Sequence, residues 1–181
     1  MSTPSDRYFT PQELLDLVDE QWPGVNGPGI DLDPCWDPCS RVKAARIYDI
    51  RVGENGLELP WEGRVWLNPP YSPAPDRWLA RAAAHAAPLL GREVLALVPA
   101  AVSTDYWRAH VWPTASVCCL APRPKFGVPG STRDTIHLRD CAALYYGEHH
   151  DAFERVWARR GQLVRAAHPN PGRTNCLSRK A

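Results

Sequence analysis

The chain has 181 residues, 44% of them hydrophobic, and a formal net charge of +1. This length and composition indicate one folded domain with a sizeable core, and they exclude a disordered polymer and a bulk polycation. No stretch approaches the roughly 20 consecutive apolar residues of a membrane helix, and the first residues lack the basic and then apolar order of a secretory signal, so we expect a cytoplasmic protein.

The N-terminal part of the chain predicts a helix and then a strand. Thr10 and Pro11 indicate the start of the helix, with Thr10 as a hydroxyl cap and Pro11 in the first position. Apolar residues within 14–18 supply its buried stripe. Residues 29–34 predict a short strand that runs into a loop, and a polar segment with a glycine-rich turn follows.

A second strand is predicted over residues 64–67, because the double proline directly after it cannot continue a ladder. The further predicted elements are a helix over 76–90, a strand over 93–98, a helix capped by Thr104, strands over 115–120 and 141–146, and a helix over 149–166. Strands that alternate with helices favour an α/β fold with a mainly parallel sheet and helices on both faces. We expect a single domain over 1–167 and a basic, disordered tail over 168–181.

The six cysteines do not form a metal-binding pattern. Cys35 and Cys39 are four residues apart, and Cys118 and Cys119 are adjacent. Neither arrangement has the two-residue spacing of a zinc site, and no histidine pair completes one. We therefore expect no bound metal and reduced cysteines.

Residues 68–71 combine the groups that methylation of an exocyclic amine requires. The amino nitrogen of adenine is a poor nucleophile because its lone pair is delocalised into the ring. The side-chain oxygen of Asn68 and the carbonyl of Pro69, held by Pro70, can accept hydrogen bonds from the amino hydrogens and leave the lone pair facing an electrophilic methyl group. The ring of Tyr71 can stack on a base swung out of the duplex.

The same four residues also fit a polar strand end with a double-proline turn, and proteins and RNA are methylated through the same tetrapeptide. Further matches follow one another from about Tyr8 to Gly147. They lie at residues 10–11, 31–35, 55–57, 61, 64–72, 78, 97–100, 104, 107 and 123–126. On these residues the chain resembles the phage-type Dam-like DNA N6-adenine methyltransferases, which bacteriophages and prophages encode.

The resemblance implies a Rossmann-like methyltransferase fold, S-adenosylmethionine as methyl donor, adenine in DNA as acceptor, and a bacterial host cell as location. Thr10 and Pro11 would lie beside the methionine moiety of the donor. Asp31 or Asp33 would hold its amino group or its ribose hydroxyls. Asn55, at a position where the family usually has an acid, would meet its adenine with a neutral amide. The other implied cofactor contacts are Pro34 and Cys35.

Basic residues later in the chain are candidates for contact with DNA. Acids outnumber bases in residues 1–60, whereas no acid follows Glu154. Arg123, Lys125 and Phe126 follow a predicted strand, and they form either a phosphate clamp with an aromatic ring on the target base or a basic loop around a buried Phe. Arg133 is a further candidate for DNA contact. The sequence does not determine the oligomeric state.

Two other functions remain open at this point. One is methylation of cytosine N4 or of another amino group, although cytosine enzymes more often begin the tetrapeptide with Ser. The other is a catalytically idle module that keeps the fold and binds DNA or a partner. Binding of S-adenosylmethionine separates these functions, because an idle module should bind it weakly or not at all.

Overall fold

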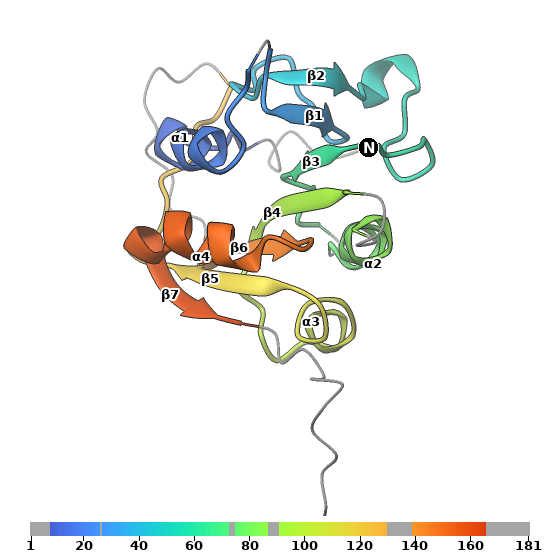
Figure 1. Cartoon of the computed structure of the whole chain (residues 1–181). Coiled ribbons are helices and arrows are strands. Elements are labelled where there is room, and N and C mark those ends of the chain that lie inside the picture. The colour runs from blue at the N-terminus through green and yellow to red at the C-terminus, as the bar shows by residue number, and fades with distance from the viewer. Residues whose placement is uncertain (1–7, 26, 73–74, 87–90, 130–138, 166–181) are drawn as a thin grey trace, which may run out of the picture.

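The computed structural model describes residues 8–25, 27–72, 75–86, 91–129 and 139–165. Within these residues one seven-stranded sheet has the order β2-β1-β3-β4-β6-β5-β7 (Figure 1). Its strands are β1 (Ile30–Asp33), β2 (Ala44–Ile47), β3 (Arg64–Leu67), β4 (Glu93–Pro99), β5 (Ser116–Leu120), β6 (Cys141–Tyr146) and β7 (Gly161–Val164). The helices are α1 (Gln12–Gln21), α2 (Asp76–His85), α3 (Asp105–His110) and α4 (His150–Trp157), with 3-10 turns η2 (Ile50–Val52) and η4 (Ala158–Arg160).

The sheet is partly parallel. Each neighbouring pair from β2 to β4 is parallel, whereas β6 is antiparallel to both β4 and β5, and β7 is antiparallel to β5. The fold is therefore α/β, as the sequence predicted, but the sheet is only partly parallel rather than mainly parallel. The parallel half contains β1, which ends at Asp33, and β3, which the candidate residues 68–71 follow directly.

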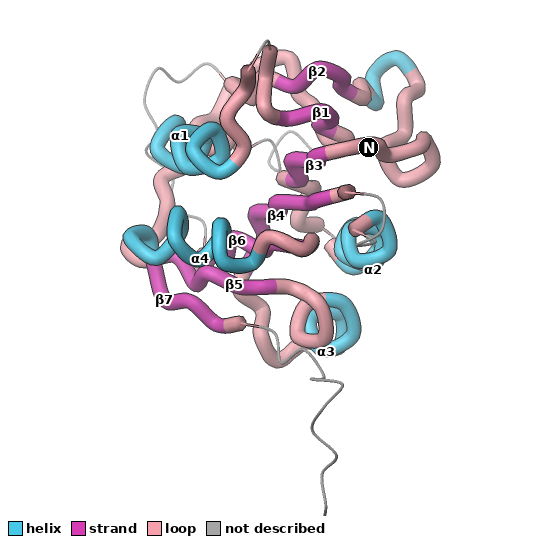
Figure 2. The backbone as a smooth tube through the Cα atoms, in the orientation of Figure 1, coloured by secondary structure: helices cyan, strands magenta, loops and turns pink. Residues whose placement is uncertain are grey.

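Helices cover both faces of the sheet, which confirms the predicted layers (Figures 1 and 2). Apolar residues of α1 and α4 pack in one cluster with Leu95 and Leu97 of β4. Residues of α2 and α3 pack in the other with Val94, Ala96 and Val98 of the same strand. All residues of β4 are buried, because alternate side chains enter the two layers. In the part of the chain that the structure describes, no helix is long and apolar enough to span a membrane.

Two predictions at the edges of the sheet are wrong. The helix expected over 149–166 ends at Trp157, and after η4 the chain forms β7, which pairs with β5. A Cβ added at Gly161 would lie 2.0 Å from the carbonyl oxygen of Cys119, so a residue without a side chain permits this close approach. The polar segment at Ala44–Ile47 is the edge strand β2, whose partly exposed residues carry no apolar pattern that would predict it.

The start of α1 also differs from the prediction. Pro11, not Thr10, occupies the N-cap position, and its carbonyl accepts the N–H groups of Leu14 and Leu15. A residue before proline is kept extended, which holds Thr10 outside the helix. The Thr10 hydroxyl is therefore free for a contact elsewhere, and it lies beside Asn68.

Candidate active site

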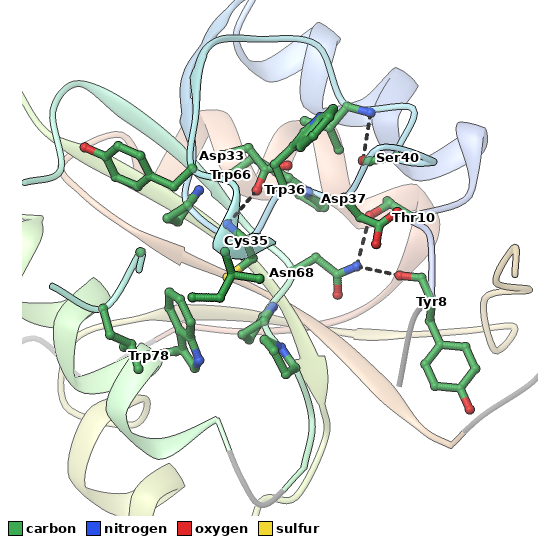
Figure 3. Close-up of a pocket in the computed structure, with 18 of the residues that line it drawn as sticks. Tyr8, Thr10, Asp33, Cys35, Trp36, Asp37, Ser40, Trp66, Asn68 and Trp78 are labelled. Atoms are coloured by element: carbon green, nitrogen blue, oxygen red, sulfur yellow. Dashed lines mark hydrogen bonds between the residues drawn. The ribbon is translucent and has the colours of Figure 1, made fainter. Parts of the chain in front are cut away.

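A pocket of about 460 Å³ opens at the carboxyl ends of β1 and β3 (Figure 3). β1 pairs with β2 on one side and with β3 on the other, so the chain order reverses at β1. Ligands of open α/β sheets bind outside the carboxyl ends of the strands at such a reversal. The volume lies in the range of sites for small molecules and cofactors.

Most of the predicted catalytic and cofactor residues line this one pocket. These lining residues are Thr10, Asp33, Pro34, Cys35, Asn55, Asn68, Pro69, Pro70 and Tyr71. Pro11 and Asp31 do not line it. Asp31 is exposed and accepts the N–H of Arg64 at 2.7 Å, at the amino end of β3 and away from the pocket. Of the two candidate acids, only Asp33 therefore faces the site.

The side-chain amide of Asn68 has defined partners at both ends. Its Nδ2 donates to the carbonyl of Tyr8 at 3.2 Å and to Oγ1 of Thr10 at 3.4 Å (Figure 3). Its Oδ1 accepts a hydrogen bond from the Tyr71 hydroxyl at 3.1 Å. A carbonyl can only accept, so the Tyr8 contact assigns Nδ2 to that side and leaves Oδ1 on the other.

The Tyr71 hydroxyl lies between two acceptors. Besides Oδ1 of Asn68 it reaches the carbonyl of Leu97 at 3.3 Å. Burial raises the pKa of Tyr71 well above its usual range, so the hydroxyl keeps its proton at physiological pH. The single hydrogen can be donated to either acceptor.

Asp33, the last residue of β1, is a carboxyl group with only 4% of its surface exposed. Burial raises its pKa to about 7, and the hydrogen bond that its Oδ1 accepts from the N–H of Cys35 at 3.0 Å opposes this rise. No cationic side chain among the described residues contributes to this pKa. The group is therefore suited to pair with a cation brought by a ligand.

The charge of the pocket is acidic. Its lining includes the carboxyl groups of Asp33, Asp37 and Glu54, against the single guanidinium group of Arg77 in the described part of the chain. No recognisable motif contains Asp37, Glu54 or Arg77, so the sequence predicts no role for them. Tyr8, Trp36 and Trp78 also line the pocket, and they were not predicted as site residues.

The segment after η2 builds part of the pocket wall. Asn55 uses its own amide locally, accepting the N–H of Leu57 at 3.0 Å and donating to Glu58 Oε1 at 2.8 Å. The carbonyl of Gly56 accepts from Trp61 Nε1 at 2.8 Å, and a Cβ at Gly56 would lie 2.0 Å from the Pro34 carbonyl oxygen. The two pocket loops approach so closely here that a side chain would not fit, which explains why residue 56 is glycine.

The predicted DNA-contacting residues have different surroundings. Nε of Arg123 lies 2.6 Å from Oδ1 of Asp140, with both side chains largely exposed, and Lys125 is exposed. Phe126 is fully buried and meets the Tyr8 ring edge-on, with 6.4 Å between ring centroids. The structure therefore contradicts contact of the Phe126 ring with a base and agrees with the alternative of a basic loop around a buried Phe. Arg133 and the tail over 168–181 lie outside the described residues.

Within the described ranges, no group of three His, Cys, Asp or Glu side chains is placed to hold a metal ion. Cys35, which lines the pocket, is a free thiol. Burial and the neighbouring Asp33 raise the pKa of the Cys35 thiol well above its usual range, so it is a neutral group in the pocket wall.

Comparison with known proteins identifies the family. The family model of DNA N-6-adenine-methyltransferase (Dam) matches residues 2–140, which include every described residue named above as lining the pocket. Neither the curated proteins nor the solved structures contain a significant match to the chain. The chain belongs to the DNA N-6-adenine-methyltransferase (Dam) family, whose members are adenine-specific DNA methyltransferases.

Proposed function

We propose that this pocket binds S-adenosylmethionine and that residues 68–71 present the N6 amino group of a flipped adenine to it. The observation that carries the proposal is that Asn68, with its oxygen directed away from the Tyr8 carbonyl, shares one pocket with the buried Asp33. The strand order supports a Rossmann-like methyltransferase fold, because the pocket lies at its reversal point. We assign the activity to one domain over 1–167.

The chemistry of the pocket fits the donor. S-adenosylmethionine carries an ammonium and a sulfonium group, and the pocket offers the carboxyl groups of Asp33, Asp37 and Glu54. Asp33 is placed to accept the ammonium group or ribose hydroxyls in charge-assisted hydrogen bonds. The rings of Trp36 and Trp78 line the same cavity and offer apolar faces to a nucleobase (Figure 3). When bound, the donor supplies an electrophilic methyl group on its sulfur.

The catalytic contribution of the chain is the orientation of an amine. Oδ1 of Asn68 and the carbonyl of Pro69 accept hydrogen bonds from the two N6 hydrogens of adenine. These bonds turn the nitrogen lone pair away from the ring system. The positive charge that develops on N6 is stabilised by these two acceptors, and the bonds of Asn68 Nδ2 to Tyr8 and Thr10 orient Oδ1 before the substrate arrives. The Tyr71 ring, which lines the same pocket, stacks on the flipped base.

Contacts with the DNA backbone are assigned to the loop after β5. Lys125 is exposed, and Arg123 is held by an exposed ion pair with Asp140 that a phosphate can replace. Both side chains lie in the loop that contains Phe126 and Gly127, the residues that contact the N-terminal segment next to Asn68. The loop is therefore near enough to the pocket to contact a duplex whose base is flipped into it.

The test is incubation of the protein with unmethylated DNA and isotopically labelled S-adenosylmethionine, followed by digestion and mass analysis of the nucleosides. The proposal expects label in N6-methyladenine and none with Asn68→Ala. Label in N4-methylcytosine would instead assign the cytosine reaction. Absence of transfer together with undetectable donor binding in calorimetry would identify an idle module.

A further inference from the structure

Asn68 is held by a short segment from the beginning of the described chain. We infer that this segment, Tyr8 with Phe9 and Thr10, is a positioning strap that orients the Asn68 amide for catalysis, and that the loop at Phe126 and Gly127 holds it in place. Thr10 then acts through Asn68 as a positioning residue. The inference rests on the proposed role of Asn68 as acceptor of the N6 hydrogens.

Orientation matters because the two ends of an amide have opposite hydrogen-bonding character. An adenine amino group only donates here, so it needs Oδ1 and is repelled by Nδ2. A rotation of the Asn68 amide by half a turn would place Oδ1 against the Tyr8 carbonyl, which also only accepts. The bond from Nδ2 to the Tyr8 carbonyl therefore selects the rotamer that presents oxygen to the substrate.

The Thr10 hydroxyl adds a second acceptor for the same Nδ2, at 3.4 Å. Thr10 is only 3% exposed, so its hydroxyl is withdrawn from bulk water and is placed to limit movement of the amide. Asn68 and the strap are nearly sixty residues apart in sequence and meet only through the fold (Figure 3).

The strap itself is anchored to the loop after β5. Phe9 and Gly127 exchange two backbone hydrogen bonds, with N–H to carbonyl distances of 2.9 and 3.2 Å. The Tyr8 ring packs edge-on against the buried Phe126. A displacement of this loop therefore moves the carbonyl that orients Asn68. Phe126 consequently affects the rate of methyl transfer through the strap, whereas Lys125 on the same loop is exposed.

The first test replaces Thr10. Thr10→Val removes the acceptor and keeps the shape, and we expect kcat to fall about three- to tenfold, as for the loss of one neutral hydrogen bond, with the donor Kd and the DNA KM changed less than about twofold. Thr10→Ser should restore kcat. Thr114→Val is the matched control, because the Thr114 hydroxyl also makes one long bond (3.3 Å, to the His110 carbonyl) but lies before β5, which β4 and β6 separate from β3 in the sheet.

A readout independent of turnover is the side-chain amide resonance of Asn68 in ¹⁵N-labelled protein. It should shift in Thr10→Val and stay unchanged in Thr114→Val. An unchanged resonance in Thr10→Val would overturn the inference even if the enzyme methylates adenine. So would a weakened donor Kd with an unaltered kcat, which would make Thr10 a cofactor contact. A shifted resonance in a protein that methylates another base would leave the strap valid and reject the proposed substrate.

The second test concerns the anchor. Phe126→Leu keeps the site apolar but removes the ring that meets Tyr8, and we expect a lower kcat with unchanged DNA affinity. Tyr8→Leu removes the other ring while keeping the Tyr8 carbonyl, and it should give the same result if Phe126→Leu lowers the yield of folded protein. Weakened DNA binding with an unchanged kcat in either variant would show that the loop acts on DNA directly and would reject the anchor.

Discussion

The hydroxyl of Tyr71 lies 3.1 Å from Oδ1 of Asn68 and thus uses the acceptor that the proposed reaction requires for the substrate. The target amine and this hydroxyl compete for the same oxygen. The carbonyl of Leu97, 3.3 Å from the hydroxyl, offers the proton another partner. Tyr71 can therefore release Asn68 to an incoming base without leaving its own buried hydroxyl unpaired.

This competition leads to a prediction for Tyr71→Phe. Removing the hydroxyl removes the competitor for Oδ1 but keeps the ring that stacks on the base, so we expect methyl transfer to be retained. Tyr71→Ala should weaken the hold on the flipped base by about 1–3 kcal/mol, because the stacking surface is lost. Both are measured as kcat/KM on duplex DNA with donor at saturation. A Phe variant as impaired as the Ala variant would contradict the stacking role.

Asn68→Ala should abolish methyl transfer while the fold and the affinity for S-adenosylmethionine stay largely intact. The reason is that the variant loses the side-chain acceptor, whereas Asp33 and the walls of the pocket are untouched. Methyl transfer, thermal unfolding and calorimetric donor binding are measured on the same preparation. Substantial residual turnover would remove Asn68 from the reaction.

The raised pKa of Asp33 predicts how donor binding depends on pH. With a pKa of about 7 in the free protein, Asp33 is ionised only above that pH, and a bound ammonium group lowers its pKa. Binding below pH 7 must therefore release a proton. The association constant should rise by up to about tenfold per pH unit from about pH 5.5 to about pH 7 and level off above it. Calorimetry in buffers of different ionisation enthalpy also measures the released proton.

Substitutions of Asp33 and of Asp31 distinguish the roles of these two acids of β1. Asp33→Ala should lower donor affinity by about 1.5–3 kcal/mol, and Asp33→Asn should remove the pH dependence. Asp31→Asn changes an equivalent acid that accepts the N–H of Arg64 outside the pocket, so donor affinity should not change. The opposite pattern, with Asp31 affecting donor binding and Asp33 without effect, would reject the assignment.

The salt dependence of DNA binding tests the loop after β5. Each phosphate contact removed should reduce the slope of log K against log salt by about one unit, so the double variant Arg123→Ala and Lys125→Ala should bind DNA more weakly with a shallower slope. Donor affinity should not change. Asp140→Asn releases Arg123 from its ion pair and should strengthen DNA binding at low salt.

The basic C-terminal segment provides the comparison for this loop. Deletion from His168 onward should reduce DNA affinity less than the double loop variant does. Fluorescence anisotropy with a labelled duplex at several salt concentrations measures both. If the deletion removes most of the salt dependence, the C-terminal segment and not the loop is the DNA anchor.

The candidate tetrapeptide over residues 68–71 and the pair of acids in β1 could be predicted because both are local in sequence. Asn68 follows a strand that two prolines must end, and Asp33 ends the strand that precedes a loop, so the sequence alone predicts a strand end at each. The separation of Asp31 from Asp33 could not be predicted. Two acids two residues apart on one strand have the same pattern, and only the folded structure shows that Asp33 lines the pocket whereas Asp31 accepts the N–H of Arg64 outside it.

The sequence by itself determined the family, the alternation of helices and strands, and the residue types that can present an amine to a methyl donor. Only the tertiary structure decided that Thr10 contacts Asn68 rather than capping α1, and that Phe126 is buried against Tyr8 rather than facing DNA. The physical reason is the same in both cases. A hydroxyl or a ring finds its partner across the fold, where segments more than fifty residues apart meet, and no local pattern of residues contains that pairing.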